Sequence, residues 1–540
     1  MRSISLVLIA MSLSAVCQGY RPADFDRDGI VNFYDFAVFS DQWLDEDPNV
    51  TAGSFIYTVA ASDAPNSLKV KADYICDGID DQVEIQSAID ALPDGGGKIL
   101  LLGGQYNVDK AGDHYCINLR NNTTLEGLGW GTVIYLVDDA NATVVYAREV
   151  KGAVVRDLAI DGNKNNQFPV TNYEPDMWPD MWTNGICLDY SSSCLISNVY
   201  VKDTLMHGIN LNDHSCSNIV ENCFVEDIGT DWTVYQAASC ILIFNHCDDN
   251  VVKNNVCVAA SINPPTASRG IYVSYYSSRN LIDGNILTDF RQGIWFVFSY
   301  CNANEFINNC IYDCDLCGIG GTTNSHITSS CNIIAANRIE NCVGDGISFC
   351  GQGTTEGYKW IITDNIVNGA TRAFAIYTGK LKMNDIIVSG NQLVCDSNGI
   401  FITSCNNIQI TDNLIDSDGF GVCIGAGNSG VILRGNNIKS ILAGISGDIG
   451  AISEIAGNVG FITENSGIAT IAAEDNSIVV AHGLDLTPTD GDIIVVPTNS
   501  MGNATKFYVS NYTSTNFKIT VDQAPGPATA TFAWKAKIEK

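Results

Sequence analysis

Short apolar runs that alternate with period two recur along the chain between about residues 151 and 460. Each copy opens with a Gly-Ile pair and closes with a polar turn. The glycines of these pairs are residues 185, 208, 270, 293, 318, 346, 399 and 444. Weaker copies near Cys240, Phe374 and Val422 bring the spacing into the low twenties to low thirties. A repeat of this length indicates a solenoid built from stacked coils.

A second series of apolar runs lies between the Gly-Ile runs, and each of its members follows an asparagine. These asparagines are residues 198, 222, 255, 285, 309, 337, 365, 391, 413, 436 and 458. Neither series has the 3.6-residue spacing of a helix, so each repeat is predicted to be a set of short strands. Stacked coils of this kind bury one continuous core.

Both ends of the repeat region have a different pattern. Residues 82–92 place Val83, Ile85, Ala88, Ile89 and Leu92 on one face of a predicted helix, and Pro93 with three glycines ends it. The preceding acids Asp77, Asp80 and Asp81 are predicted to be turn and cap residues. After about residue 460, short strands separated by turn residues predict a small β-sandwich.

These features resemble the right-handed parallel β-helix of the pectate-lyase-like superfamily, which includes polysaccharide lyases, glycosidases, epimerases and phage tailspikes. The opening motif from Asp77 to Gly97 is similar to the start of many such chains, in which a helix closes the end of the solenoid. The resemblance implies an all-β fold with an N-terminal capping helix. We expect a signal peptide at 1–19, a calcium-binding segment at 20–50, the β-helix at 51–465 and a C-terminal β-sandwich at 466–540.

Composition limits the partners and the compartment. The formal net charge of -31 disfavours nucleic acid and anionic membranes as partners. Residues 1–19 have a short basic start and an apolar run, as in a secretory signal, and no later segment has an apolar run long enough for a membrane span. We therefore expect a secreted or cell-surface protein. Several of the 20 cysteines recur at repeat positions, which is typical of small apolar residues stacked inside a solenoid.

The N-terminal segment contains one calcium-loop motif. Residues 24–35 supply oxygen ligands around the sharp turn at Gly29, as a calcium site requires. The predicted metal ligands are Asp24, Asp26, Asp28, Ile30, Asn32 and Asp35. The motif resembles one half of a dockerin, which normally has two such loops, and the resemblance implies a cohesin-like partner.

Candidate chemistry lies in the early coils, where three turns are unusually long and two of them carry aromatic residues. Loops on a rigid scaffold are a common place for function, and aromatic faces suit sugar rings. Stacking the repeats from their opening glycines brings polar and aromatic residues onto one face. The catalytic candidates are His207, Arg269, Asp189, Asp227 and Asp231. The substrate-binding candidates are Trp178, Trp182, Asn210, Asn212, Trp232, Tyr235, Tyr272 and Trp295.

Two classes of function remain open. The first is a carbohydrate-active enzyme. A lyase would use His207 or Arg269 as the base, with calcium or arginine to neutralise a uronate carboxylate, whereas a hydrolase would use Asp189 with Asp227 or Asp231. The Asn-Thr-Asp motif of polygalacturonases and the Asp-Pro-His motif of alginate epimerases are both absent. The second class is a non-catalytic glycan-binding or adhesion protein, because one fold hosts many functions.

Overall fold

The computed structural model describes residues 55–168, 183–229, 238–259, 268–297, 300–323, 329–351, 356–378 and 382–538. All described elements belong to a unit that spans Ile56–Lys540. The predicted calcium loop lies outside the described residues. No helix in the described ranges is long and apolar enough to cross a bilayer.

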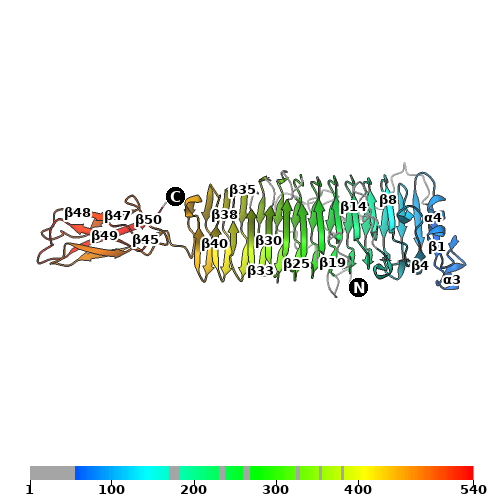
Figure 1. The fold of residues 1–540 in the computed structure, drawn as a ribbon, viewed down its shortest axis with the longest axis horizontal. Helices are drawn as coiled ribbons and strands as arrows, with labels where there is room; N and C mark the ends of the chain where they lie inside the picture. Colours follow the sequence, from blue (N-terminus) through cyan, green and yellow to red (C-terminus); the bar gives the residue numbers. More distant parts are fainter. Residues whose placement is uncertain are drawn as a thin grey trace, which may run out of the picture. The chain divides into compact units, whose positions relative to one another are not determined.

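The described unit contains a right-handed parallel β-helix with three strands in most coils, one in each of three sheets. Figure 1 shows the strands of successive coils stacked side by side. The 13-stranded sheet that contains the Gly-Ile strands is called sheet C here. Its strands are β5 (Tyr115–Asn118), β8 (Thr143–Arg148), β11 (Ile186–Asp189), β14 (His207–Asn212), β17 (Ser239–Phe244), β20 (Arg269–Ser274), β23 (Gln292–Val297), β26 (Cys317–Thr323), β30 (Asp345–Gly351), β34 (Arg372–Thr378), β37 (Ile400–Ile402), β40 (Phe420–Ile424) and β43 (Ala443–Gly447).

The asparagine series divides the remainder of each coil into two strands, which belong to sheets A and B. Sheet B has 13 strands. They are β4 (Gly104–Val108), β7 (Thr132–Leu136), β10 (Ala159–Asp161), β13 (Tyr200–Lys202), β16 (Phe224–Glu226), β19 (Val256–Val258), β22 (Ile286–Thr288), β25 (Cys310–Tyr312), β29 (Arg338–Glu340), β33 (Ile366–Ala370), β36 (Gln392–Cys395), β39 (Leu414–Ser417) and β42 (Asn437–Ser440).

Sheet A has 18 strands. They are β1 (Ile56–Ala60), β2 (Tyr74–Ile75), β3 (Gly97–Leu101), β6 (Thr123–Glu126), β9 (Val154–Arg156), β12 (Leu195–Ser197), β15 (Ile219–Glu221), β18 (Val251–Lys253), β21 (Leu281–Asp283), β24 (Glu305–Ile307), β27 (Ser329–Ser330), β28 (Ile333–Ala335), β31 (Glu356–Tyr358), β32 (Ile361–Thr363), β35 (Lys382–Ser389), β38 (Cys405–Thr411), β41 (Val431–Arg434) and β44 (Ile452–Ala456).

The opening glycine found in most sheet C strands has a steric cause. A Cβ atom at Gly208 would lie 2.7 Å from the carbonyl oxygen of Cys240 in the next coil and 2.4 Å from a core methyl of Val225. Gly270 and Gly293 meet the same obstruction. The chain therefore turns into sheet C where only a very small residue lets neighbouring coils approach.

A buried ladder of asparagine side chains links the coils between sheets A and B. In Asn436, the amide nitrogen donates to Asn458 Oδ1 and to the Ile410 carbonyl, while its oxygen accepts bonds from Asn413. The ladder begins at Asn255, because the preceding coils have Cys223 and Val199 in this place. Asn198 and Asn222 lie one position earlier, in left-handed turn conformation, so their predicted place in the series was wrong by one residue.

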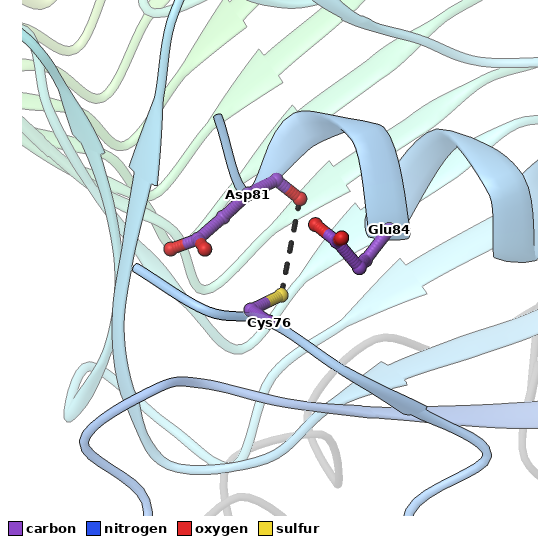
Figure 2. A group of neighbouring side chains, drawn as sticks. All are labelled: Cys76, Asp81 and Glu84. Carbon is purple, nitrogen blue, oxygen red and sulfur yellow. Dashed lines mark hydrogen bonds between the residues drawn. The ribbon is translucent and has the colours of Figure 1, made fainter. Parts of the chain in front are cut away.

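The N-terminal end is closed by α4 (Gln82–Asp90), as predicted, with the short α3 (Asn66–Lys69) before it. Asp81 is the N-cap residue of α4, and its carboxylate accepts backbone N–H bonds from Gly78 in the preceding turn at 2.8 Å and from Asn107 of β4 at 2.7 Å. Figure 2 shows Asp81 beside Cys76 and Glu84. Two short 3-10 helices, η1 (Lys164–Asn166) and η3 (Ile449–Ala451), occur elsewhere.

The C-terminal residues form two three-stranded antiparallel sheets around their own apolar core, as predicted for a β-sandwich. Phe517 and Phe532 are fully buried in that core. The six strands are β45 (Glu464–Ile471), β46 (Ser477–Ala481), β47 (Ile493–Pro497), β48 (Phe507–Ser510), β49 (Asn516–Val521) and β50 (Ala530–Lys537).

Candidate functional site

The outer face of sheet C holds a hydrogen-bonded cluster around Asp189, the last residue of β11. Tyr146 Oη donates to Asp189 Oδ2 at 2.8 Å, and Asn212 Nδ2 donates to Asp189 Oδ1 at 3.0 Å. Arg148 Nη1 lies 3.3 Å from the same carboxylate. Strand register explains the cluster, because Arg148, Asp189 and Asn212 occupy equivalent positions on β8, β11 and β14. We call Tyr146, Arg148, Asp189 and Asn212 the Asp189 cluster.

Burial controls the protonation of the cluster. Asp189 is 1 % exposed, and this burial raises its pKa, although the bonds from Tyr146 and Asn212 oppose the shift. Burial and then the Asp189 charge raise the pKa of Tyr146, which keeps its phenol protonated. The hydrogen bond with Tyr146 raises the pKa of Arg148. Arg148 remains half-exposed, so it is a cation that a ligand in solution can reach.

Two residues of β5 and the turn before it flank this cluster. The His114 ring lies edge-on to the Tyr146 ring with centroids 5.2 Å apart, and Tyr115 stacks on Tyr146 at 5.4 Å. Burial lowers the pKa of His114, so the imidazole is neutral near pH 7. The cluster thus combines a neutral imidazole, a protonated phenol, an accessible guanidinium and a carboxylate. This combination can transfer protons and hold an anion.

A second carboxylate lies close to Asp189. Asn212 Nδ2 also donates to Asp213 Oδ2 at 3.3 Å. The two bonds to one nitrogen place the Asp189 and Asp213 oxygens within about 6 Å of each other, near the carboxyl separation of retaining glycosidases.

The catalytic candidate His207 lies away from the cluster. His207 opens β14, whereas Asn212 ends it and pairs with Asp189. His207 lies five residues before Asn212, the residue that pairs with Asp189. This separation is about 16 Å along the strand at 3.3 Å per residue. His207 Nδ1 accepts the Ser239 backbone N–H at 3.2 Å.

The candidate Arg269 opens β20 and also lies at that end of the sheet. Its Nε donates to Gln292 Oε1 at 2.9 Å, and its Cζ lies 4.4 Å from the centre of the Tyr272 ring. Asn210 and Trp295 occupy the same cross-strand row as Tyr272. Asn210 is fully buried, and both of its side-chain polar atoms lack a partner.

The other candidates are not part of the Asp189 cluster. Asp227 follows β16 of sheet B, and its carboxylate pairs with Lys164 Nζ at 2.7 Å. The remaining candidates lie outside the described residues, in the long turns: Asp231, Trp178, Trp182, Trp232 and Tyr235.

Tyr146, Arg148, His114 and Asp213 were not among the sequence candidates. The coil of β8 has Val144 where most of the others have the opening glycine, so the Gly-Ile signature does not mark it. The strand register could have identified Arg148. If the alignment of the repeats is extended by one coil toward the N-terminus, Arg148 pairs with Asp189.

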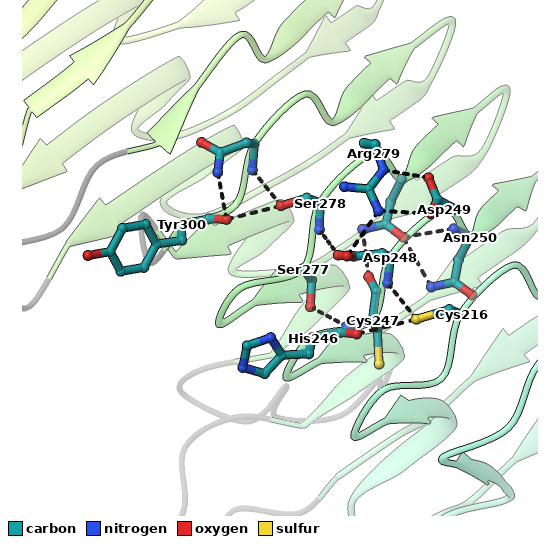
Figure 3. Close-up of polar contacts among 12 residues, drawn as sticks. Cys216, His246, Cys247, Asp248, Asp249, Asn250, Ser277, Ser278, Arg279 and Tyr300 are labelled. Atoms are coloured by element: carbon teal, nitrogen blue, oxygen red, sulfur yellow. Dashed lines mark hydrogen bonds and ion pairs between the residues drawn. The ribbon is translucent and has the colours of Figure 1, made fainter. Parts of the chain in front are cut away.

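An exposed stack of rings follows the turn after sheet C, beside the cluster. Its members are Tyr190, His214, His246, Tyr276 and Tyr300, with successive centroids 4.6 to 5.4 Å apart. All five residues have left-handed backbone conformation. Figure 3 shows His246 and Tyr300 at this corner, where Arg279 pairs with Asp248 and Asp249.

Comparisons with known proteins give partial matches. Residues 231–423, less than half of the chain, match the family model described as periplasmic copper-binding protein (NosD). Mannuronan C5-epimerase AlgE4 of Azotobacter vinelandii is 28% identical over 34% of this chain and 32% of its own length. AlgE6 of the same organism is 31% identical over 29% of this chain and 18% of its own length. The chain thus spans a third or less of these relatives.

A solved structure confirms the fold. A mutant tailspike protein of E. coli bacteriophage HK620, in complex with pentasaccharide, superposes with a TM-score of 0.56 over 85% of this chain and 90% of its own. The sequence identity is 11%, so this likeness shows the fold alone.

The described residues do not fit a metal site on sheet C. His214 and His246 stack nearly parallel at 4.8 Å, so the in-plane lone pairs of the two rings do not converge on one ion. In the described ranges, three side chains of the types that bind metal ions lie close together at the N-terminal cap. They are Cys76, Asp81 and Glu84. Both Asp81 oxygens there are engaged by backbone N–H groups, and burial raises the pKa of the Cys76 thiol.

Proposed function

We propose that this protein is a carbohydrate-active enzyme that removes the C5 proton of a uronate unit in an acidic polysaccharide, at the Asp189 cluster on sheet C. One observation carries the proposal: Tyr146, Asp189 and the half-exposed Arg148 are joined in one contact network. The names of the partial relatives, mannuronan C5-epimerases, support uronate chemistry.

Each group has a role in this chemistry. Arg148 pairs with the uronate carboxylate, which makes the neighbouring C5–H bond more acidic. The neutral imidazole of His114 accepts the C5 proton, and the electron pair delocalises into the carboxylate. Asp189 orients Tyr146 through its hydrogen bond. No water or redox partner is consumed in this step.

Two outcomes follow from the same intermediate. In β-elimination, the bond to the O4 leaving group breaks and the Tyr146 phenol supplies a proton to that oxygen, giving an unsaturated sugar. In epimerisation, a proton returns to C5 from the opposite face, and Tyr146 is the donor. Lyase and epimerase therefore share the first step and differ in where the second proton goes.

Hydrolysis is the second candidate, because Asp189 and Asp213 share the Asn212 amide. In this alternative, Asp189, whose pKa burial raises, would be the acid and Asp213 the nucleophile. The sequence-based partner Asp227 is occupied by Lys164. A third outcome is a glycan-binding protein without catalysis.

The proposal also keeps two sequence-based expectations. Calcium would be bound by the loop at residues 24–35, and the protein would act outside the cell on a polymer too large to be imported. Arg148 supplies the positive charge that a lyase needs at the carboxylate. We therefore expect turnover to persist after chelation of calcium.

The test is an assay of three products on polymers of mannuronate, guluronate and galacturonate. Deuterium incorporation at C5 in heavy water reports proton exchange, ultraviolet absorbance reports the unsaturated product, and new reducing ends without absorbance report hydrolysis. Tyr146→Phe should lower the yield of the unsaturated product, or of the product inverted at C5, by about 100-fold or more. Tyr115→Phe is the matched control, since Tyr115 packs on Tyr146 through its ring.

Each result decides between the candidates. Wild-type yields of the unsaturated or inverted product in Tyr146→Phe would overturn the proposed role of the phenol. Reducing ends that disappear in Asp213→Asn would favour hydrolysis. Retention on a polysaccharide column without any product would establish the binding protein instead.

A further inference from the structure

Two arginines of sheet C occupy equivalent positions but have different partners. Arg269 and Arg372 open β20 and β34, in one cross-strand row with Gln292 and Asp345. Arg372 Nε donates to the Asp345 carboxylate at 2.8 Å. Arg269 Nε donates to the neutral amide of Gln292 at 2.9 Å. One arginine therefore has a counter-ion within the fold, and the other has a neutral partner.

The guanidinium of Arg269 is incompletely satisfied. Its Nη1 atom is buried and has no hydrogen-bond partner. Burial lowers its pKa, and the nearby Arg291 cation lowers it further. Among the described residues, no carboxylate pairs with it. The ring contact with Tyr272 offsets a part of the cost of burying a cation but supplies no acceptor for Nη1.

The neighbouring groups do not supply the missing charge. His207 accepts the Ser239 N–H through Nδ1, so its proton is on Nε2. Burial and then the Arg269 charge lower the pKa of His207 to about 3, which leaves a neutral ring. The hydroxyl of Tyr272 accepts a bond from Ser274 Oγ at 3.1 Å. The surroundings of Arg269 are thus neutral side chains, several of them donors, and a further cation, Arg291.

A second unmet group points to the same face. Asn210 is 0 % exposed, and neither its Oδ1 nor its Nδ2 has a partner. It lies in one row with Tyr272, two strands away. A buried amide without partners is rare in folded proteins. Both deficits would be removed by one ligand with a negative charge and hydroxyl groups.

We infer that Arg269 forms a carboxylate-binding subsite on sheet C that is separate from the Asp189 cluster, with Asn210 as its neighbouring hydroxyl-binding group. The two places are three strands and five residues apart, or about 22 Å by standard strand geometry. The subsite would hold the carboxylate of a sugar several units away from the reacting one. The identification of that sugar as a uronate rests on the proposed function.

The test uses glucuronate and glucose as small probes, with wild type, Arg269→Gln and the double variant Arg372→Gln/Asp345→Asn. The double variant is the matched control, because it removes an arginine of the same row together with its counter-ion. Glucuronate should raise the Tm of wild type and of the control, and glucose should raise neither. Arg269→Gln should lose most of the shift and bind glucuronate about 10- to 100-fold more weakly by calorimetry.

The ligand-free proteins provide a second readout. Because Arg269→Gln removes an uncompensated cation, its Tm without ligand should equal or exceed that of wild type. An equal glucuronate shift in wild type and Arg269→Gln would overturn the inference, as would a wild type that does not respond to glucuronate. These results are independent of turnover. Loss of product formation in Tyr146→Phe, with the glucuronate shift unchanged, would separate the subsite from the reaction.

Discussion

The burial of His207 should make the stability of the β-helix fall as the pH is lowered. His207 is 3 % exposed, and it has a hydrogen-bond acceptor role toward Ser239. Burial, followed by the charge of Arg269, lowers its pKa from 6.5 to about 3. In His207→Gln the amide oxygen can accept the same N–H bond, while the side chain no longer takes up a proton.

The size of the effect follows from the two pKa values. Between about pH 6.5 and 3 the unfolded chain binds a proton at His207 that the folded chain does not, so stability is present above pH 6.5 and is lost as the pH falls. At pH 5 the loss from this residue is about 2 kcal/mol relative to neutral pH. His207→Gln lacks this term.

Urea denaturation at pH 7 and pH 5 measures the difference. Wild type should lose about 2 kcal/mol more than His207→Gln over this interval. A variant that is destabilised without a change in any titrating group, Asn436→Ala, should keep the wild-type pH dependence. Parallel losses in wild type and His207→Gln would refute the argument, since His207 would then be protonated equally in both states.

Three further predictions concern single side chains. Asn436→Ala should lower the free energy of unfolding by about 3 to 5 kcal/mol, because it removes four buried hydrogen bonds. Asn437→Ala, which changes the exposed neighbouring residue, should have little effect. Hydrogen exchange in the adjacent coils measures the effect of both variants. Burial raises the pKa of Asp189 in the folded protein, so the stability that this residue contributes is lost as the pH rises. The stability of Asp189→Asn relative to wild type should therefore increase as the pH rises from about 4. Tm values of both proteins from about pH 4 to 7 check the direction of this change. His246→Asn keeps a residue that tolerates left-handed backbone and removes two ring stacks, so it should cost about 1 to 2 kcal/mol in thermal unfolding, and an unchanged Tm would contradict this.

The coil repeat could be predicted because its marker residues meet local physical needs. Gly208 is a glycine because a Cβ would meet the next coil, and Asn436 is an asparagine because four hydrogen bonds depend on its amide. Such needs recur in most coils and leave a period in the sequence. The capping helix was predictable because Ile85, Ala88 and Ile89 form its buried face, whereas Val83, which was also predicted to lie on that face, is exposed.

The candidate site was harder to predict because its geometry depends on register between coils. Tyr146 and Arg148 belong to a coil without the Gly-Ile signature, so nothing local placed them beside Asp189. His207 and Asp189 are polar residues of neighbouring Gly-Ile strands. His207 begins its strand and Asp189 ends its own, so the two residues lie at opposite ends. Sequence spacing identified the strands correctly and could not show which ends meet.

The two unusual electrostatic features of sheet C imply a dependence of activity on ligand length. Arg148 in the Asp189 cluster is an accessible cation. Arg269, whose Nη1 has no hydrogen-bond partner, lies about 22 Å from Asp189 on the same sheet. A short uronate oligomer that occupies the cluster cannot reach Arg269, so its kcat/KM should be the same in wild type and Arg269→Gln. A longer oligomer reaches both places, and its KM should rise about 10-fold or more in the variant while kcat is kept, because the lost contact is far from the reacting bond. Equal KM values for long oligomers would mean that the polymer leaves the cluster in another direction, and a loss of kcat with short ones would mean that Arg269 acts on the reaction itself.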